Sequence, residues 1–326
     1  MANKTDGSDD AHDRQRSGQG ENRRGFLRQL CAGAVAAAGS HVAETSARAE
    51  QAPTTKLPTI KLGKFTVTRL VAGGNPVGAY SHSTQNLAKH MREYFTQERT
   101  TEFAQRCVKA GINTWQTHYS AKIGKALRTL RERGTPLQWI CLTSDLPSES
   151  PLKDVLALKP IAIVHHGGVT DTRFRLDRHQ EVRDFVKKVH DAGVMAGVSS
   201  HNPANIAHIE EKGWENEFFM TCFYNVLRSG KDIRAKLGSE LLGEPFLKSD
   251  PEQMTSVMQQ VKRPCLGFKI LAAGRLCWTE HSVQAAFRFA FDRIKKTDGV
   301  IVGMYPKFSD EISYNAQLTQ KYGMPA

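Results

Sequence analysis

The chain has 326 residues, of which 40% are hydrophobic and 24% charged, as is ordinary for a globular protein with a sizeable core. Its formal net charge is +12, but Lys and Arg are spread along the chain. No helix-turn-helix or ribonucleoprotein-type signature occurs, so nucleic-acid binding is not expected. The six cysteines form no CxxC pair and stand mostly in apolar runs, which excludes a disulfide framework and a zinc ribbon.

The first 49 residues are expected to lie outside the folded domain. Residues 1–22 are polar and predict disorder. The sequence RRGFL at residues 23–27 precedes a mildly apolar, Ala-rich segment that is too short and too weakly apolar for a stable membrane span. The small-x-small sequence ARA at residues 47–49 predicts cleavage after Ala49.

This arrangement closely resembles the twin-arginine export signal, with a disordered basic tail as the alternative. The resemblance implies that the twin-arginine export machinery carries the protein, already folded, to the periplasm or another extracytoplasmic space. Residues 50–326 would then be the mature chain.

Residues 50–326 are expected to form one domain. The segment TIKLGKFTVTRLVAGGNP, from residue 59, contains two short alternating runs around Gly63 and Lys64, which predict a β-hairpin leading into a buried strand at residues 70–72. Short apolar runs then alternate with helical stretches, as expected for parallel strands buried on both faces. The helices are predicted near residues 123–133, 152, 180–192, 203–212, 231, 254, 283–295 and 310–321.

Eight strands in this alternation predict an α/β fold, a single (β/α)₈ TIM barrel behind the N-terminal hairpin. An open doubly wound sheet is the rival, but AGGNPVG after the first strand does not match G-x-G-x-x-G. Active sites of such barrels lie at the C-terminal ends of the strands. Reading those ends gives a polar ring that includes four histidines: Asn75, Gln116, His118, Ser144, Asp145, His165, His166, Ser199, Ser200, His201, Tyr224, Asn225, Lys269, Tyr305 and Lys307.

Several segments, by their order and spacing, resemble the aldo/keto reductase family over roughly residues 60–318. They are TVTRLVAGGNPVG, AGINTWQTHYS, GVSSHNPANI, CFYNVLR, ILAAGRL and GVIVGMYPKFSDEISYN. The resemblance implies NADP as the cofactor, whose reduced form, NADPH, transfers a hydride to the carbonyl of a small molecule. In that family a Tyr donates the proton, assisted by Lys, Asp and His, and a phenol of lowered pKa beside an ammonium suits this role.

Most of that catalytic tetrad is not kept. The family's Asp falls on Gln116, and its Tyr falls on Ala121, with Tyr119 two residues early. The Lys position falls on Ser144, and the family's His is retained at His166 or His165. Reduction of a carbonyl would therefore require Tyr119 as the acid, with His118 or Lys122 replacing the missing cation.

Of the positions that bind the cofactor in the family, some keep the family's residue in this sequence and others do not. Ser199 and Ser200 stand where a Ser-Asn pair holds the nicotinamide carboxamide, and Tyr224 and Asn225 match a pair in which the Tyr stacks on the ring. Lys307 and the helix that follows it are suited to the adenosine phosphate.

Two other functions fit the same residues. His118, Asp145, His166 and His201 could converge as the ligands of a divalent metal ion and support hydrolysis or isomerisation. Alternatively, the chain is an exported binding barrel without catalytic activity. The sequence predicts a small-molecule site under each of the catalytic hypotheses.

Overall fold

The computed structural model describes residues 56–135, 137–143 and 149–324. The predicted signal segment, Ser144 and Asp145 lie outside these ranges. Eight parallel strands close into a barrel in the order β10-β3-β4-β5-β6-β7-β8-β9, which confirms the predicted TIM barrel. The strands are β3 (Leu70–Gly73), β4 (Thr114–His118), β5 (Gln138–Thr143), β6 (Ala162–His165), β7 (Met195–Ser200), β8 (Phe218–Cys222), β9 (Cys265–Phe268) and β10 (Gly299–Gly303).

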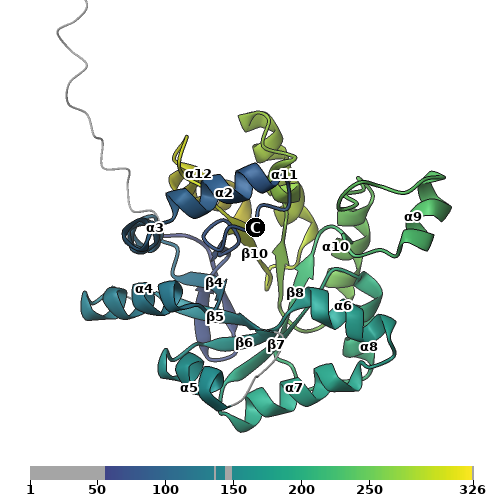
Figure 1. Ribbon diagram of the computed structural model, residues 1–326, viewed down its shortest axis with the longest axis horizontal. Coiled ribbons are helices and arrows are strands. Elements are labelled where there is room, and N and C mark those ends of the chain that lie inside the picture. Colours follow the sequence, from purple (N-terminus) through teal and green to yellow (C-terminus); the bar gives the residue numbers. More distant parts are fainter. Residues whose placement is uncertain (1–55, 136, 144–148, 325–326) are drawn as a thin grey trace, which may run out of the picture. The chain divides into compact units, whose positions relative to one another are not determined.

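Helices connect the strands and surround the barrel (Figure 1). Among the described residues, no helix is both long enough and apolar enough to cross a membrane. The helices are α2 (Gln85–Tyr94), α3 (Gln97–Lys109), α4 (Ala121–Glu132), α5 (Glu149–Ala157), α6 (Gly167–Arg175), α7 (Gln180–Asp191), α8 (Pro203–Glu211), α9 (Gly230–Leu237), α10 (Asp250–Gln260), α11 (Glu280–Arg293) and α12 (Glu311–Gly323), with a 3₁₀ turn, η1 (Ala272–Gly274).

Capping side chains set where several helices begin. Thr84, Ser120 and Asn202 each accept a hydrogen bond from a backbone N–H in the first turn of α2, α4 and α8. Pro203 then occupies the first turn of α8, where its missing N–H costs nothing. Helix α6 begins directly after a strand, and its sequence GGVTDTRFR contains few strong helix formers, so the sequence did not predict it.

The predicted N-terminal hairpin is present as β1 (Thr59–Leu62) and β2 (Phe65–Thr68), paired antiparallel. Its residues Ile60, Leu62 and Val67 are buried in one cluster with barrel residues such as Val71 and Val164. These contacts join the hairpin to the interior of the barrel at the end where the strands begin. The opposite end, where the strands finish, remains available for a functional site.

Arg69 holds the strand-beginning end of the barrel together. Its buried guanidinium donates to the backbone carbonyl oxygens of Asp298 (2.7 Å), Gly323 (2.7 Å) and Lys295 (2.9 Å). It therefore ties the start of β3 to the start of β10 and to the end of α12. Burial lowers the pKa of Arg69, and the nearby carboxylate of Asp298 acts in the opposite direction.

Substitution Arg69→Met should lower the free energy of unfolding by about 3 kcal/mol, because three buried carbonyl groups lose their donors. Urea denaturation followed by circular dichroism measures this change. The exposed Arg92 is a matched control, and Arg92→Met should change the free energy by less than about 0.5 kcal/mol. Equal effects of the two substitutions would contradict the role assigned to Arg69.

Candidate functional site

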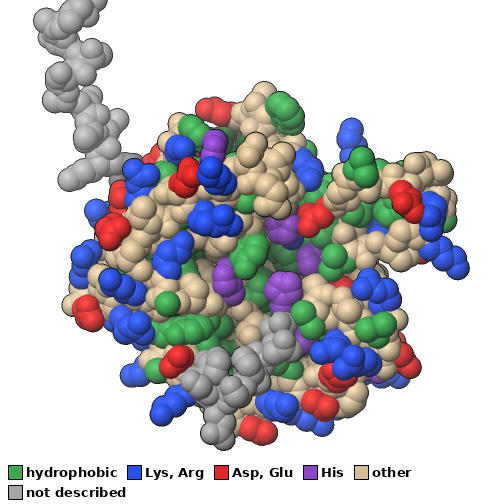
Figure 2. Space-filling view, viewed as in Figure 1, with side chains coloured by type: hydrophobic (Ala, Val, Ile, Leu, Met, Phe, Trp, Pro, Cys, Tyr) green, Lys and Arg blue, Asp and Glu red, His purple; other side chains and the backbone are tan. Residues whose placement is uncertain are grey.

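A cavity of about 1200 Å³ opens at the strand-finishing end of the barrel. In Figure 2, His side chains gather around a hollow near the middle of the face shown, with hydrophobic side chains between them. The residues of the predicted polar ring that line the cavity are Asn75, Gln116, His118, His166, Ser199, His201, Lys269 and Tyr305. They come from six different strands or the loops after them, as a barrel site requires.

The structure distinguishes the two neighbouring histidines at the end of β6. His166 lines the cavity, whereas His165 is buried and packs against the ring of Phe185, with ring centroids 4.8 Å apart. A hydrogen bond of 2.7 Å joins Nδ1 of His165 to Oγ1 of Thr170. Burial lowers the pKa of His165 to about 4, so the ring is neutral at pH 7. His165 is therefore a packing residue. The prediction that it belongs to the catalytic site is wrong, because its side chain does not line the cavity.

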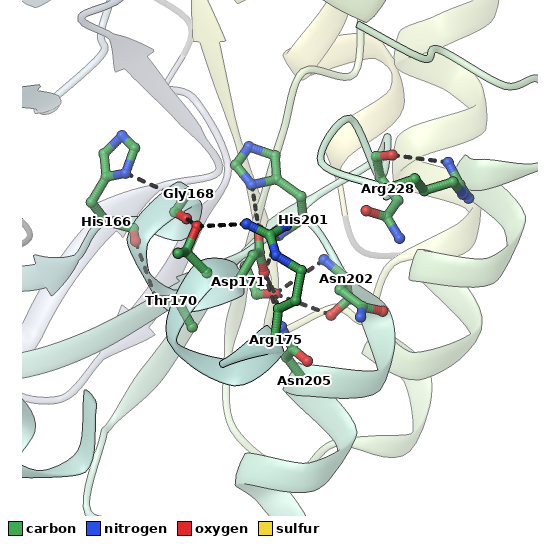
Figure 3. Close-up of polar contacts among 12 residues, drawn as sticks. His166, Gly168, Thr170, Asp171, Arg175, His201, Asn202, Asn205 and Arg228 are labelled. Carbon is green, nitrogen blue, oxygen red and sulfur yellow. Dashed lines mark hydrogen bonds and ion pairs between the residues drawn. The ribbon is translucent and has the colours of Figure 1, made fainter. Parts of the chain in front are cut away.

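Asp171 on α6 fixes the orientation of His201. The Asp171 carboxylate accepts hydrogen bonds from Nδ1 of His201 (2.8 Å), the backbone N–H of His201 (3.1 Å), Nδ2 of Asn205 (3.0 Å) and the hydroxyl of Ser200 (Figure 3). An ionised carboxylate only accepts, so Nδ1 of His201 carries the hydrogen. In the neutral ring, Nε2 then keeps its lone pair and can act as a base.

His166 has the opposite tautomer. It caps α6, and its Nδ1 accepts a hydrogen bond of 3.1 Å from the backbone N–H of Gly168 (Figure 3). The hydrogen of the neutral ring is therefore on Nε2, which can donate. Burial lowers the pKa of His166, and electrostatic interactions with His201 and with the ammonium of Lys269 lower it further. One cavity thus contains one imidazole donor and one imidazole acceptor.

Gly167 permits Ser199 and His201 to approach the start of α6. A Cβ atom at this position would lie 2.8 Å from Oγ of Ser199 and 3.1 Å from Cε1 of His201, so any larger residue would displace them. Ser199 is 1% exposed and lines the cavity. Its hydroxyl has no hydrogen-bond partner among the described residues, which leaves it available to a ligand.

The residues proposed to replace the missing tetrad do not assemble as expected. Tyr119 lines the cavity, but its hydroxyl donates to Oδ2 of Asp154 (3.4 Å), and its pKa is raised by burial and by that carboxylate. A phenol of raised pKa is a weaker proton donor. Nζ of Lys122 donates to the carbonyl oxygens of Val77 (3.0 Å) and Phe95 (2.9 Å), and Lys122 does not line the cavity.

The side chains of Gln116 and His118 do reach the cavity from the end of β4. Burial, with a smaller contribution from Lys122, lowers the pKa of His118. The edge of the His118 ring lies against Tyr80, with centroids 5.1 Å apart. His118 is therefore a neutral contact residue at pH 7 and does not supply the cation that the tetrad lacks.

Four of the five predicted cofactor-binding residues lie away from the cavity lining. The Ser200 hydroxyl binds Asp171, and the Tyr224 ring packs against Phe246 at 5.1 Å between centroids. The Asn225 backbone N–H donates to Oδ2 of Asp250 at 3.1 Å, and Lys307 lies outside the lining. The fifth residue, Ser199, does line the cavity.

The start of α12 is poorly suited to a phosphate. The side chain of Asp310 caps the helix and pairs with Arg106 at 2.8 Å. Oε2 of Glu311 accepts the backbone N–H of Tyr305 at 2.6 Å. These two carboxylates already complement the positive end of the helix dipole, and their charges would repel a phosphate there. The residues predicted to hold NADP therefore do not fit it in this arrangement.

A metal site is not found among the residues that the structure describes, since no group of three or more His, Cys, Asp or Glu side chains is placed to hold an ion. His118, His166 and His201 all line the cavity without forming such a group. The fourth proposed ligand, Asp145, lies outside the described residues.

The structure adds a contact that the sequence could not indicate. Nδ1 of His82 lies 2.8 Å from Oε1 of Glu244, and Nε2 of His82 lies 3.0 Å from Nδ2 of Asn75. His82 and Glu244 are 162 positions apart, and both line the cavity. This pair connects the loop after β3 with the loop between α9 and α10. Because it depends on the tertiary arrangement, no local sequence pattern could have identified it.

No family model matches the chain, and no curated protein matches it either. The solved structures that resemble it include three that match at low identity. Glycerol dehydrogenase AKR11B4 from Gluconobacter oxydans, an aldo/keto reductase, is 12% identical (82% of this chain, 97% of that one, TM-score 0.47). Dihydropteroate synthase from Xanthomonas albilineans is 11% identical (82% and 97%, TM-score 0.47). 3-Keto-L-gulonate-6-phosphate decarboxylase from Vibrio cholerae is 10% identical (70% and 94%, TM-score 0.42). Likenesses of this degree concern the barrel and carry no argument about activity.

Because the predicted cofactor-binding residues are not arranged to hold NADP, we expect the protein not to bind NADPH tightly. Titration of the protein with NADPH, followed by nucleotide fluorescence and by the midpoint of thermal unfolding, should show no saturable binding up to about 1 mM. Saturation in the micromolar range, abolished by Ser199→Val, would contradict this expectation and restore NADP-dependent carbonyl reduction as the favoured function.

Proposed function

We propose that the protein is an acid–base enzyme that moves a proton on a small carbonyl compound bound in the barrel cavity. The observation that carries this proposal is the hydrogen bond between Asp171 and His201, which leaves Nε2 of His201 as an oriented acceptor at the cavity. NADP-dependent carbonyl reduction, which the resemblance to aldo/keto reductases implies, remains a separate hypothesis that the NADPH titration tests.

In the proposed step, Nε2 of His201 takes a proton from the carbon next to the carbonyl group. The electron pair of that C–H bond forms a carbon–carbon double bond, and the carbonyl oxygen gains the negative charge. Nε2–H of His166 can donate a hydrogen bond to this oxygen, and the ammonium of Lys269 adds positive charge in the same cavity. The proton returns from His201 to a carbon or oxygen of the intermediate, so no oxidant or reductant is needed.

Two features of the cavity support this chemistry. Burial lowers the pKa of His201, the hydrogen bond to Asp171 raises it, and the charge of Lys269 lowers it again, so that the ring is neutral at pH 7. A neutral imidazole next to an imidazole donor is the pair of groups that a proton transfer requires. Asp171 contributes by stabilising the imidazolium that forms when His201 accepts the proton.

Exchange of carbon-bound hydrogen for solvent deuterium, followed by NMR, tests the proposal. We expect exchange at the carbon next to the carbonyl of a suitable ketone, such as 2-oxo-4-phenylbutanoate or 4-phenylbutan-2-one. His201→Gln should lower the rate about 100-fold or more, because the base is removed. His281→Gln, at an exposed histidine on α11, is the matched control and should leave the rate unchanged.

The pH dependence separates a catalytic role of Asp171 from a structural one. Because the pKa of His201 is lowered, exchange should persist below pH of about 6.5, the ordinary pKa of histidine, and decline only at lower pH. Asp171→Asn removes the interaction that raises this pKa, so the decline should move to still lower pH while the maximal rate falls. No exchange of either ketone, or exchange unaffected by His201→Gln, would refute the proposal.

We also propose that the protein acts outside the cytoplasm after twin-arginine export, as the sequence RRGFL at residues 23–27 supports. Replacing both Arg23 and Arg24 by Lys should leave uncleaved precursor in the cytoplasmic fraction. Arg28→Lys, four residues further on, should leave export unchanged. N-terminal sequencing of the exported protein should begin at Glu50, and equal export of the double variant would reject the proposal.

A further inference from the structure

Lys269 is a cation in the cavity that forms no ion pair with any of the described residues. It follows β9, is half-buried and lines the cavity. Its Nζ lies 5.1 Å from the centre of the neighbouring Phe268 ring, and no carboxylate oxygen of the described residues comes within 4.0 Å of it. The ammonium of Lys269 is therefore free to pair with an anionic group of a ligand that enters the cavity.

The backbone at Lys269 is held in an uncommon conformation. Its φ angle is +60°, in the left-handed region that favours glycine, and Ala272 and Ala273 nearby have φ angles of +49° and +51°. The carbonyl oxygen of Lys269 accepts the backbone N–H of Ala272 at 2.7 Å, which maintains this turn. A long side chain in a position that glycine would occupy more easily points to a role for that side chain, since such strain is concentrated at functional sites.

The acidic side chains around the cavity are mostly engaged elsewhere. Glu244 pairs with His82, Glu311 accepts the backbone N–H of Tyr305, and Asp310 pairs with Arg106. Glu280 also lines the cavity, but it is exposed at the start of α11, where it complements the helix dipole. The charge of Lys269 acts on the carboxylate of Glu244 and on two histidines, since it lowers the pKa of Glu244, His166 and His201.

Apolar side chains form most of the remaining wall. Two aromatic rings stand at the rim, where Tyr80 is 55% and Trp278 is 87% exposed, although large apolar side chains in contact with water are unfavourable. Deeper apolar residues that line the cavity are Leu142, Leu152, Val155, Val226, Leu227 and Ile270. A ligand with an apolar body would cover this surface while its charged group reached the interior.

We propose that the substrate is an oxo acid with an apolar body, whose carboxylate pairs with the ammonium of Lys269. This inference rests on the proposed function and specifies its substrate class. The carboxylate would accept hydrogen bonds from Lys269, while the adjacent carbonyl oxygen accepts one from Nε2–H of His166. The apolar body would lie against the leucine side chains and the aromatic rim, and the carbon next to the carbonyl would face His201.

Isothermal titration calorimetry with 2-oxo-4-phenylbutanoate and its primary amide, 2-oxo-4-phenylbutanamide, tests this inference on the full chain. The two probes have similar size, but only the acid is charged. The wild-type protein should bind the acid at least about tenfold more tightly than the amide, as expected for a charge-assisted hydrogen bond. Lys269→Met should remove this preference, and Lys307→Met, which loses the same charge outside the cavity lining, should retain it.

A second variant separates loss of binding from loss of folding. Lys269→Gly relieves the left-handed backbone, so it should raise the midpoint of thermal unfolding by a few degrees while losing the preference for the acid. Retention of the preference in Lys269→Met, or failure of the wild-type protein to prefer the acid, would overturn the inference.

The inference can fail independently of the proposed chemistry. His201→Gln should keep the preference for the acid while losing hydrogen exchange, because it changes the base and leaves Lys269 in place. If the wild-type protein shows a preference that depends on Lys269 but no exchange, then the substrate class stands and the proton transfer fails. If exchange depends on His201 but acid and amide bind equally, then the proton transfer stands and the substrate class fails.

Discussion

The arrangement of the cavity depends on the carboxylate of Asp171. Four donors from the end of β7 and the start of α8 converge on it, including both the ring and the backbone of His201. A buried carboxylate with this many donors is well stabilised, and removing any one partner leaves a polar group without compensation. The same interaction anchors α6 against β7, so it positions His166 at the start of α6 while it sets the tautomer of His201.

The sequence predicted the architecture well because barrel strands carry a strong local signal. Continuous apolar runs buried on both faces, separated by amphipathic helices, leave few folds open, and the turn at Gly63 identified the hairpin. Helix α6 carried no such signal, since GGVTDTRFR is stabilised by tertiary contacts of Thr170 and Asp171 and only weakly by helix propensity. Because α6 was not predicted from the sequence, Asp171, the residue on which the site depends, was not predicted either.

The site itself was predicted only in part, for a related physical reason. Strand ends placed Gln116, His166 and Lys269 at the cavity because the barrel geometry brings those ends together. The sequence did not show which of His165 and His166 faces the cavity. The alternation of side chains along a strand identifies the inward face only when one face of the strand is polar. Here Ala162 and Val164 fill the barrel interior while Ile163 packs toward the helices, so both faces of β6 are equally apolar.

The sequence resembles aldo/keto reductases, whereas the cavity lacks the arrangement of their catalytic residues. These two findings are compatible because a barrel fold does not determine the chemistry at its strand ends. A barrel supports many reactions because its catalytic groups are individual side chains at strand ends, which can change without affecting the core. At the end of β4, Gln116 stands where the resemblance places an acid, and Tyr119 is engaged by Asp154. The base, the donor and the cation of the proposed step, His201, His166 and Lys269, instead line the cavity from the side of the barrel formed by β6 to β9. A site whose oriented base, donor and cation all come from that side favours proton transfer there over the chemistry that the resemblance implies.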